Sequence, residues 1–152
     1  WLGARLLAAW LGGRLPTEAE WEYACRAGST TAFCSGDSEA DLARVGWYAG
    51  NCVQKVQPVG QKEPNDWALL DMHGNTWEWC EDRYGAYSGS TSADPAGPTR
   101  GPDRVLRGGS CWDGAGRCRS AARFRYRPAY RYVNIGIRVV LVAPPPAGTL
   151  DP

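Results

Sequence analysis

The chain has 152 residues, a net charge of +1 and 43% hydrophobic against 22% charged residues, values that are ordinary for a folded globular domain and exclude wholesale disorder. This length suffices for one domain. No apolar run approaches the roughly 20 residues that cross a bilayer, so membrane insertion is not expected. Residues 1–15 show no cleavage-site pattern, so no signal peptide is predicted. The sequence predicts a soluble protein of undetermined location, and surface display would need a segment outside this chain.

Charge is distributed unevenly along the chain. Residues 1–100 carry 8 Lys and Arg against 13 Asp and Glu, whereas residues 101–152 carry 9 Arg against 3 Asp. Because arginine suits buried and bidentate ion pairs, we expect the basic third to pair with the acidic front part within one fold. Nucleic-acid binding by the basic third is the alternative, and we do not expect it.

Six cysteines are too few to build a fold of this length on disulfides, and none of them forms a CxxC pair. With His73 as the only histidine, a Cys/His zinc site is not expected. Cys111 and Cys118 lie close enough in sequence to leave a disulfide open, but free structural thiols are favoured.

Two helices are predicted near the start of the chain. Residues 2–11 place their large apolar side chains on one helical face, and the glycines that follow end the helix. Thr17 and Glu20 fit a capping box at the start of the second helix, which is expected to bury Trp21 and residues 23–25.

The remaining chain alternates short apolar pieces with Gly, Pro, Asn and Asp, a pattern that favours short strands and ordered loops. Residues 84–102 are mostly small and turn-forming, which predicts a surface excursion, and residues 143–152 are expected to form a disordered tail. We expect a helical turn at 38–44 and strands near 56–60, 77–81, 104–108, 118–123 and 135–142.

Five motifs in order resemble the formylglycine-generating, sulfatase-modifying-factor family: GRLPTEAEWEYACRAG (13–28), LLDMHGNTWEWCEDRYG (69–85), RVLRGGS (104–110), RSAAR (119–123) and NIGIRVV (134–140). The resemblance implies an α+β domain over residues 1–142, with a variant of the C-type lectin fold. It implies two helices, short twisted strands and much ordered loop. Family members usually carry a further strand region before the first helix, and this chain lacks it.

The catalytic residues of the family have no matching positions in this chain. Oxidase members hold copper with two cysteines, with four residues between them, shortly after the GGS motif. Here Cys111 follows Ser110 directly and Cys118 lies seven positions further on, so neither the offset nor the spacing matches. No copper and no catalytic residue are therefore expected. The His-rich iron site of the related sulfoxide synthases cannot be built with His73 alone.

The HGNTWEW stretch (73–79) matches the part of the family that holds a structural calcium ion. Asn75 and Glu78 would supply side-chain oxygens, and nearby backbone carbonyls the remaining ligands. The alternative is that Asn75 closes a turn, the two tryptophans lie in the core, and Glu78 faces an arginine.

Residues 111–134 mix unrelated side-chain chemistries without an apolar period. They resemble the variable region of diversity-generating retroelement proteins, in which asparagine codons scatter into other residues but not into Lys, Glu, Gln, Met or Trp. This segment contains no Lys, Glu, Gln or Met, and Trp112 would have to be a fixed position. In the C-type lectin fold it would lie on the ligand-binding face. The positions predicted to contact a ligand are Trp112, Asp113, Gly114, Gly116, Arg117, Ala122, Phe124, Tyr126, Arg127, Ala129, Tyr130, Tyr132 and Val133.

These residues predict a non-catalytic protein that binds a protein or small ligand. Aromatic side chains would supply apolar contact area with polar tips, and Arg117 and Arg127 would donate charge-assisted hydrogen bonds. Two alternatives stay open. One is a copper oxidase acting on a cysteine of a sulfatase-like substrate, and the other is a non-catalytic family member without diversification.

Overall fold

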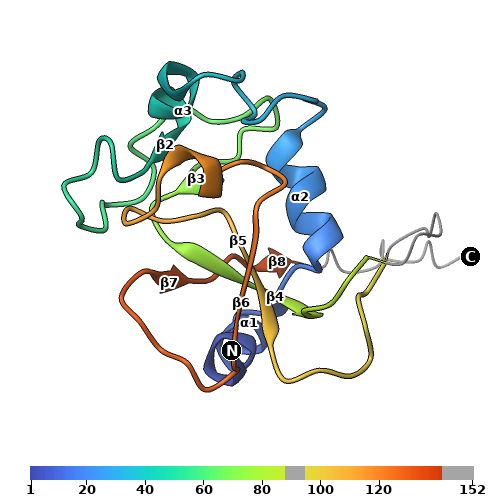
Figure 1. The fold of residues 1–152 in the computed structure, drawn as a ribbon. Helices are drawn as coiled ribbons and strands as arrows, with labels where there is room; N and C mark the ends of the chain where they lie inside the picture. The colour runs from blue at the N-terminus through green and yellow to red at the C-terminus, as the bar shows by residue number, and fades with distance from the viewer. Residues whose placement is uncertain (88–94, 142–152) are drawn as a thin grey trace, which may run out of the picture.

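A four-stranded sheet in the order β6-β5-β4-β7 lies at the centre of the computed structural model, which describes residues 1–87 and 95–141 (Figure 1). β5 runs antiparallel to both of its neighbours, whereas β4 and β7 are parallel. Two small sheets pair β1 with β8 and β2 with β3. The helices are α1 (Leu2–Trp10), α2 (Glu18–Arg26) and α3 (Glu39–Val45), with one 3-10 turn, η1 (Ala115–Arg117). The strands are β1 (Gly13–Arg14), β2 (Gly46–Trp47), β3 (His73–Gly74), β4 (Trp77–Arg83), β5 (Arg104–Arg107), β6 (Arg123–Tyr126), β7 (Ile135–Gly136) and β8 (Val140–Leu141).

β4 is buried on both faces of the sheet. Trp77 and Trp79 point toward α1, where they form a core cluster with Ala8, Leu15 and Leu106. Side chains from the alternate positions of the sheet point the other way and pack beneath α2. That second cluster consists of Trp21, Cys25, Met72, Cys80 and Val105.

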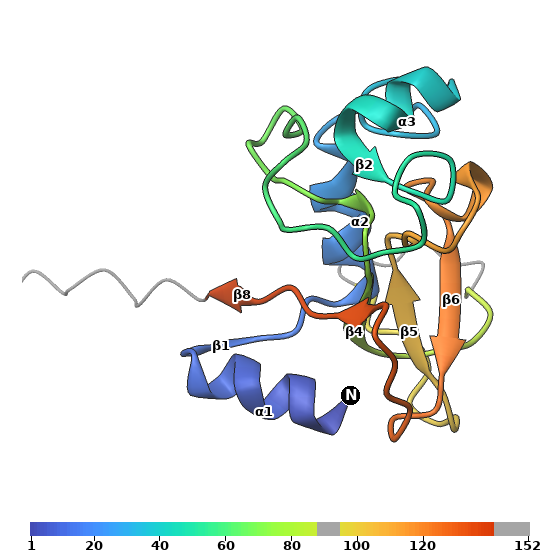
Figure 2. The same cartoon turned by 90° about the vertical axis from the view of Figure 1, so that its left-hand side faces the viewer.

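α1 meets the core through its small side chains. Ala8 is fully buried and Ala4 packs against the same cluster, whereas the face that carries the large apolar residues is exposed. Figure 2 shows α1 lying across the base of the molecule, steeply inclined to α2. The exposed apolar residues of this segment are Leu2, Leu6, Leu7, Trp10 and Leu11.

α2 begins with the predicted capping box: Thr17 accepts from the backbone of Glu20, and the Glu20 carboxylate accepts from the backbone of Thr17. Trp21 and Cys25 are buried as expected, but Tyr23 is 70% exposed, so the prediction for Tyr23 is wrong. Residues two apart on a helix point in nearly opposite directions. Tyr23 therefore faces outward, where its ring lies 4.9 Å from that of Trp67.

The expected elements differ from the structure at several places. The structure has three α-helices where the sequence predicted two and a helical turn, because residues 39–45 form a capped helix. No strand forms at 56–60, and the strand expected at 118–123 begins only at Arg123. The stretch 135–142 divides into β7 and β8. Part of the predicted excursion, residues 88–94, and the predicted tail lie outside the described residues.

The expected pairing between the two parts of the chain is confirmed. Arg107 and Arg123 reach Glu18, and Arg138 reaches Glu78. All six cysteines are free in the structure. Among the described residues no helix is long and apolar enough to span a membrane.

Candidate functional site

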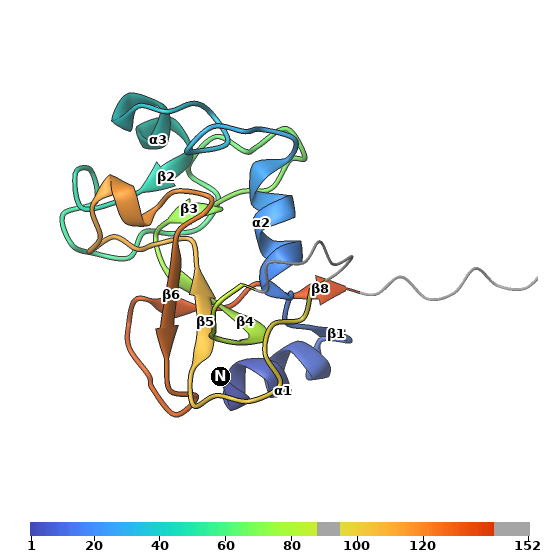
Figure 3. The same ribbon diagram turned by 45° about the vertical axis from the view of Figure 1, so that its right-hand side comes forward.

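Residues 111–134 cross the molecule from one edge of the central sheet to the other. After β5 the chain forms η1, returns as the edge strand β6, and then loops round to β7 at the opposite edge (Figure 1). Figure 3 shows β6 as the outermost strand beside β5. The segment thus includes a strand with one open edge and a long surface loop.

None of the thirteen positions predicted to contact a ligand is buried. Cys118 and Ser120, which lie between them in sequence, are fully buried. The segment therefore separates inward anchors from outward side chains. The half-buried positions are Trp112, Asp113, Ala122, Phe124 and Tyr126; the exposed ones are Gly114, Gly116, Arg117, Arg127, Ala129, Tyr130, Tyr132 and Val133.

Arg107 anchors the middle of the segment from β5. Its fully buried guanidinium donates to the backbone oxygens of Ser120 at 2.8 Å and Ala122 at 2.9 Å. The same group pairs with the carboxylates of Glu18 and Glu22 on α2. One buried charge thus connects the helix, the sheet and the candidate segment.

His73 anchors the segment at a second point. Its Nδ1–H donates to the backbone oxygen of Cys118 at 2.8 Å, so its Nε2 is left to accept the N–H of Cys34 at 3.1 Å. Burial lowers the pKa of His73, which favours this neutral tautomer. Both anchors bind backbone oxygens and leave the outward side chains unused.

A continuous ladder of aromatic rings covers the outer face of the segment. Trp77 stacks on Phe124 at 5.4 Å between ring centroids, and Phe124 meets Tyr126 edge-on at 5.2 Å. Tyr126 stacks on Tyr130 at 3.9 Å, and Tyr132 follows at 6.2 Å. The last two rings are 39% and 58% exposed. The ladder therefore begins in the core and ends in solvent.

Asp113 is the only acidic residue in the segment, and its carboxylate is engaged by the protein. Oδ2 accepts from Trp77 Nε1 at 2.8 Å and from Ser110 Oγ at 2.5 Å. Oδ1 lies 3.7 Å from the guanidinium of Arg117, which also sits 5.0 Å from the ring of Phe124. The Asp113 carboxylate thus joins Trp77, Ser110 and Arg117 beneath the ladder.

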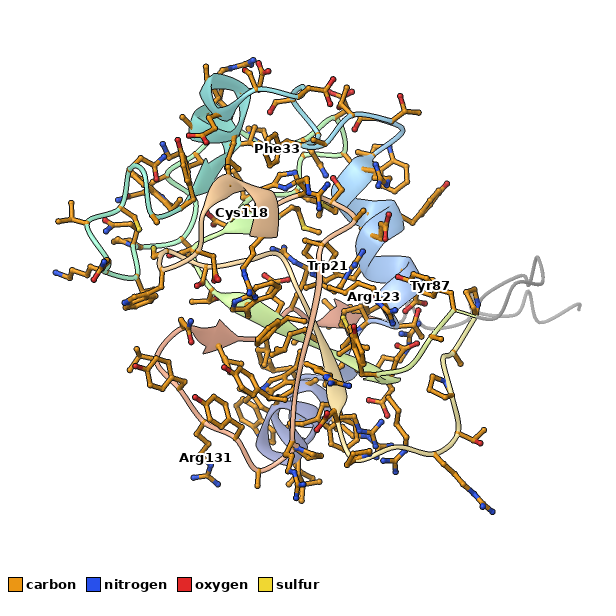
Figure 4. The ribbon with its side chains drawn as sticks, viewed as in Figure 1. Trp21, Phe33, Tyr87, Cys118, Arg123 and Arg131 are labelled. Carbon is orange, nitrogen blue, oxygen red and sulfur yellow. The ribbon has the colours of Figure 1, made fainter. Side chains whose placement is uncertain are left out.

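A groove of about 750 Å³ opens beside the exposed end of the ladder. Its floor is apolar and includes Trp79, Ile135 and Ile137, and Leu7 of α1 forms part of the far wall. Tyr130 and Tyr132 line the near side together with Arg131, which Figure 4 shows on the outside of the loop between β6 and β7.

The two residues predicted to bind calcium face different partners. Asn75 exchanges two hydrogen bonds with the backbone of Gln57, at 2.9 and 3.1 Å. Glu78 accepts a hydrogen bond from Trp21 Nε1 and forms a bidentate ion pair with Arg138. The Glu78 contacts are those of the alternative, in which it faces an arginine, whereas Asn75 binds a segment 18 residues away instead of closing a turn. Within the described residues no group of three His, Cys, Asp or Glu side chains is placed to hold a metal ion.

The cysteines after the GGS motif are sealed inside the protein. The Cys111 thiol donates to the backbone oxygen of Lys55 at 3.0 Å, and Cys118 packs in a third core cluster with Phe33 and Tyr48. Burial raises the pKa of both thiols to about 12. Neither is poised to act as a thiolate.

Sequence reasoning missed two parts of this region. Arg131 was not among the positions predicted to contact a ligand, and α1 was not connected with the candidate face. The apolar face predicted for residues 2–11 was the available signal for the groove, but the partner loop was not evident from the sequence.

This fold and surface define a domain of the formylglycine-generating-enzyme type, and comparisons with known proteins agree. The model of the sulfatase-modifying factor enzyme 1-like domain matches residues 1–143. The chain is 39% identical to the formylglycine-generating enzyme of Streptomyces coelicolor, over 91% of this chain and 49% of that protein. It is also 39% identical to the serine/threonine-protein kinase pkn1 of Chlamydia caviae, over 91% of this chain and 22% of the kinase.

Solved structures give the same result. Treponema denticola variable protein 1 superposes with a TM-score of 0.79 at 38% identity, covering 83% of this chain and 46% of that one. PvdO from Pseudomonas aeruginosa also gives a TM-score of 0.79, at 32% identity, covering 90% of this chain and 57% of that one. The chain belongs to the family of sulfatase-modifying factor enzyme 1-like domains, and it spans about half or less of the length of the curated relatives described above.

Proposed function

We propose that this domain binds a ligand through residues 111–134, without catalysing a reaction, as the variable protein of a diversity-generating retroelement. The observation that carries the proposal is the exposure of eight of the thirteen chemically mixed positions, with the other five half-buried and none buried. Their backbone is held by buried groups that do not depend on the outward side chains. The 38% identity to a variable protein of Treponema denticola supports the same function.

The alternative function is oxidation of a substrate cysteine, which the identity to the Streptomyces enzyme favours. A copper centre for that reaction needs two thiolates that reach one metal and remain open to the substrate. Cys111 and Cys118 are fully buried, and their pKa values are raised to about 12 by that burial. These residues do not fit such a centre. A family member that binds a ligand but is not diversified is the third candidate.

The DNA around the gene tests diversification directly. We expect a near-copy of the segment that encodes residues 105–138, differing from it at adenines, beside a gene for a reverse transcriptase. A complete flank without such a repeat would remove the retroelement from the proposal and leave the undiversified binding protein.

Copper binding and peptide oxidation test the absence of catalysis. The purified protein is incubated in air, so that O2 is the oxidant, with Cu(I), a thiol reductant and a cysteine-containing peptide, and the Cys111→Ser and Cys118→Ser variants serve as controls. We expect no formylglycine in the peptide and no copper signal that depends on either cysteine. Aldehyde formation that is lost in the variants would establish the oxidase instead.

A further inference from the structure

We infer that the ligand of this face is an acidic polypeptide segment with a bulky apolar or aromatic side chain, an inference that rests on the proposed function. The exposed Arg131, the exposed rings of Tyr130 and Tyr132 and an apolar groove lie together at one end of residues 111–134, and the exposed Arg127 directly precedes Pro128, which also lines the groove. The guanidiniums would bind the carboxylates of such a ligand, and the groove and the tyrosine rings would hold its bulky side chain.

The charge of the segment selects for an anion. Residues 111–134 carry six arginines and one aspartate, and that aspartate is occupied by internal hydrogen bonds. Among the described residues no ion pair joins Arg127 or Arg131 to a carboxylate, and both side chains are exposed. A carboxylate on a partner would therefore meet guanidiniums that are free to form charge-assisted hydrogen bonds.

The groove selects for a bulky side chain beside the anion. Its floor of Trp79, Ile135 and Ile137 is apolar, and Arg131 lies on its rim between Tyr130 and Tyr132. The two tyrosine rings are already stacked on the ladder, so little side-chain freedom is lost when a ligand packs against them. A large residue in the groove would place neighbouring carboxylates against the rim.

The same features favour a polypeptide over a nucleic acid. Four of the six arginines are committed within the protein: Arg117 to Asp113, Arg119 to Gly116, Arg123 to Glu18, and Arg125 to Asp103. Within the described part of the chain this leaves two arginines of the segment without such a partner, too few for the multiple phosphate contacts that dominate nucleic-acid affinity.

Fluorescence anisotropy with labelled random copolymers tests the ligand class. The probes are a copolymer of glutamate and tyrosine, the matching copolymer of lysine and tyrosine, and single-stranded oligothymidylate. We expect the glutamate copolymer to bind best, and more weakly at higher salt because exposed charges are screened. The Arg127→Gln, Arg131→Gln double variant should lose affinity about tenfold. Arg44→Gln, which removes an exposed arginine of α3, should leave it unchanged.

Two results would overturn the inference. One is stronger binding of the lysine copolymer or oligothymidylate, and the other is a glutamate-copolymer affinity that the double variant does not lower. Selection from a random peptide library then separates this failure from that of the proposed function. Non-acidic peptides that lose binding in the Tyr130→Ala, Tyr132→Ala variant would refute the acidic class and keep the binding face. A library in which no peptide distinguishes that variant from the original protein would refute both.

Discussion

Replacing Arg107 with methionine tests the buried charge that joins α2 to the candidate face. The substitution keeps side-chain volume but leaves the carboxylates of Glu18 and Glu22 without this partner, and it removes two donors from the backbone oxygens of residues 120 and 122. Removing one partner of a buried ion pair costs about 3–5 kcal/mol, and here, among the described residues, Glu18 keeps only Arg123 and Glu22 keeps only Arg26 as ion-pair partners. For a chain of this length that corresponds to a decrease in Tm of roughly 6–20 °C.

Urea unfolding followed by tryptophan fluorescence measures this loss. Arg44→Ala is the matched control, because it removes an arginine whose pair with Glu63 is exposed and therefore contributes less than about 1 kcal/mol. Adding Glu22→Gln to Arg107→Met should restore about 1 kcal/mol, since it removes a partly buried carboxylate that keeps only Arg26 as its ion-pair partner. An Arg107→Met free energy of unfolding as high as that of the Arg44→Ala control would show that the cluster does not hold the segment.

Three further predictions address the scaffold. Burial lowers the pKa of His73 below 6.5, so the unfolded chain takes up the proton first and stability should decrease as the pH falls below 6.5; a urea midpoint independent of pH between about 5 and 7 would contradict this. Gly74→Ala should destabilise the protein by about 2–5 kcal/mol, because φ is +78° and the new Cβ would lie 1.9 Å from the backbone oxygen of Trp47. The control Gly114→Ala should cost under about 1 kcal/mol, since there is open space around Gly114. Equal shifts in Tm for the two variants would refute the difference. Cys34 is the one thiol that is not buried, so a thiol reagent should label it first and the other five only on unfolding. Rapid labelling of a second thiol in the folded protein would contradict the burial of the other five.

Local signals in the sequence predicted the helices and the two central strands. The capping box at Thr17 and the apolar strand beginning at Trp77 depend on residues that are neighbours in sequence. The strand predicted at 56–60 failed for a non-local reason. The backbone N–H and C=O of Gln57 are satisfied by the side-chain amide of Asn75, which takes the place of a strand partner. An amide 18 residues away leaves no periodic signal in the sequence.

The surface placement of most of residues 111–134 was predictable because the chemistry of the segment is irregular. Side chains that must pack in a core impose a period, and residues 111–134 have none. The roles of Arg107 and His73 in holding the segment were not predictable, because both depend on contacts between residues that are far apart in sequence. The groove was not predictable either, because it forms where α1 meets the loop after β6.

The anchoring of residues 111–134 determines how freely their side chains can vary. The backbone N–H of Ser120 donates to Ala32, and the backbone oxygens of the same stretch accept from Arg107 and His73. Substitutions at the eight exposed positions leave these bonds intact, so we expect Tm changes of only a few degrees even when several are combined. Asp113 differs, because its carboxylate holds the Trp77 indole and the Ser110 hydroxyl beneath the ring ladder. We therefore expect substitutions of Asp113 to lower Tm more than substitutions at the eight exposed positions, and Asp113 to vary least in a diversified set. Unfolding measurements on a small library of variants at the thirteen positions would test the difference in Tm.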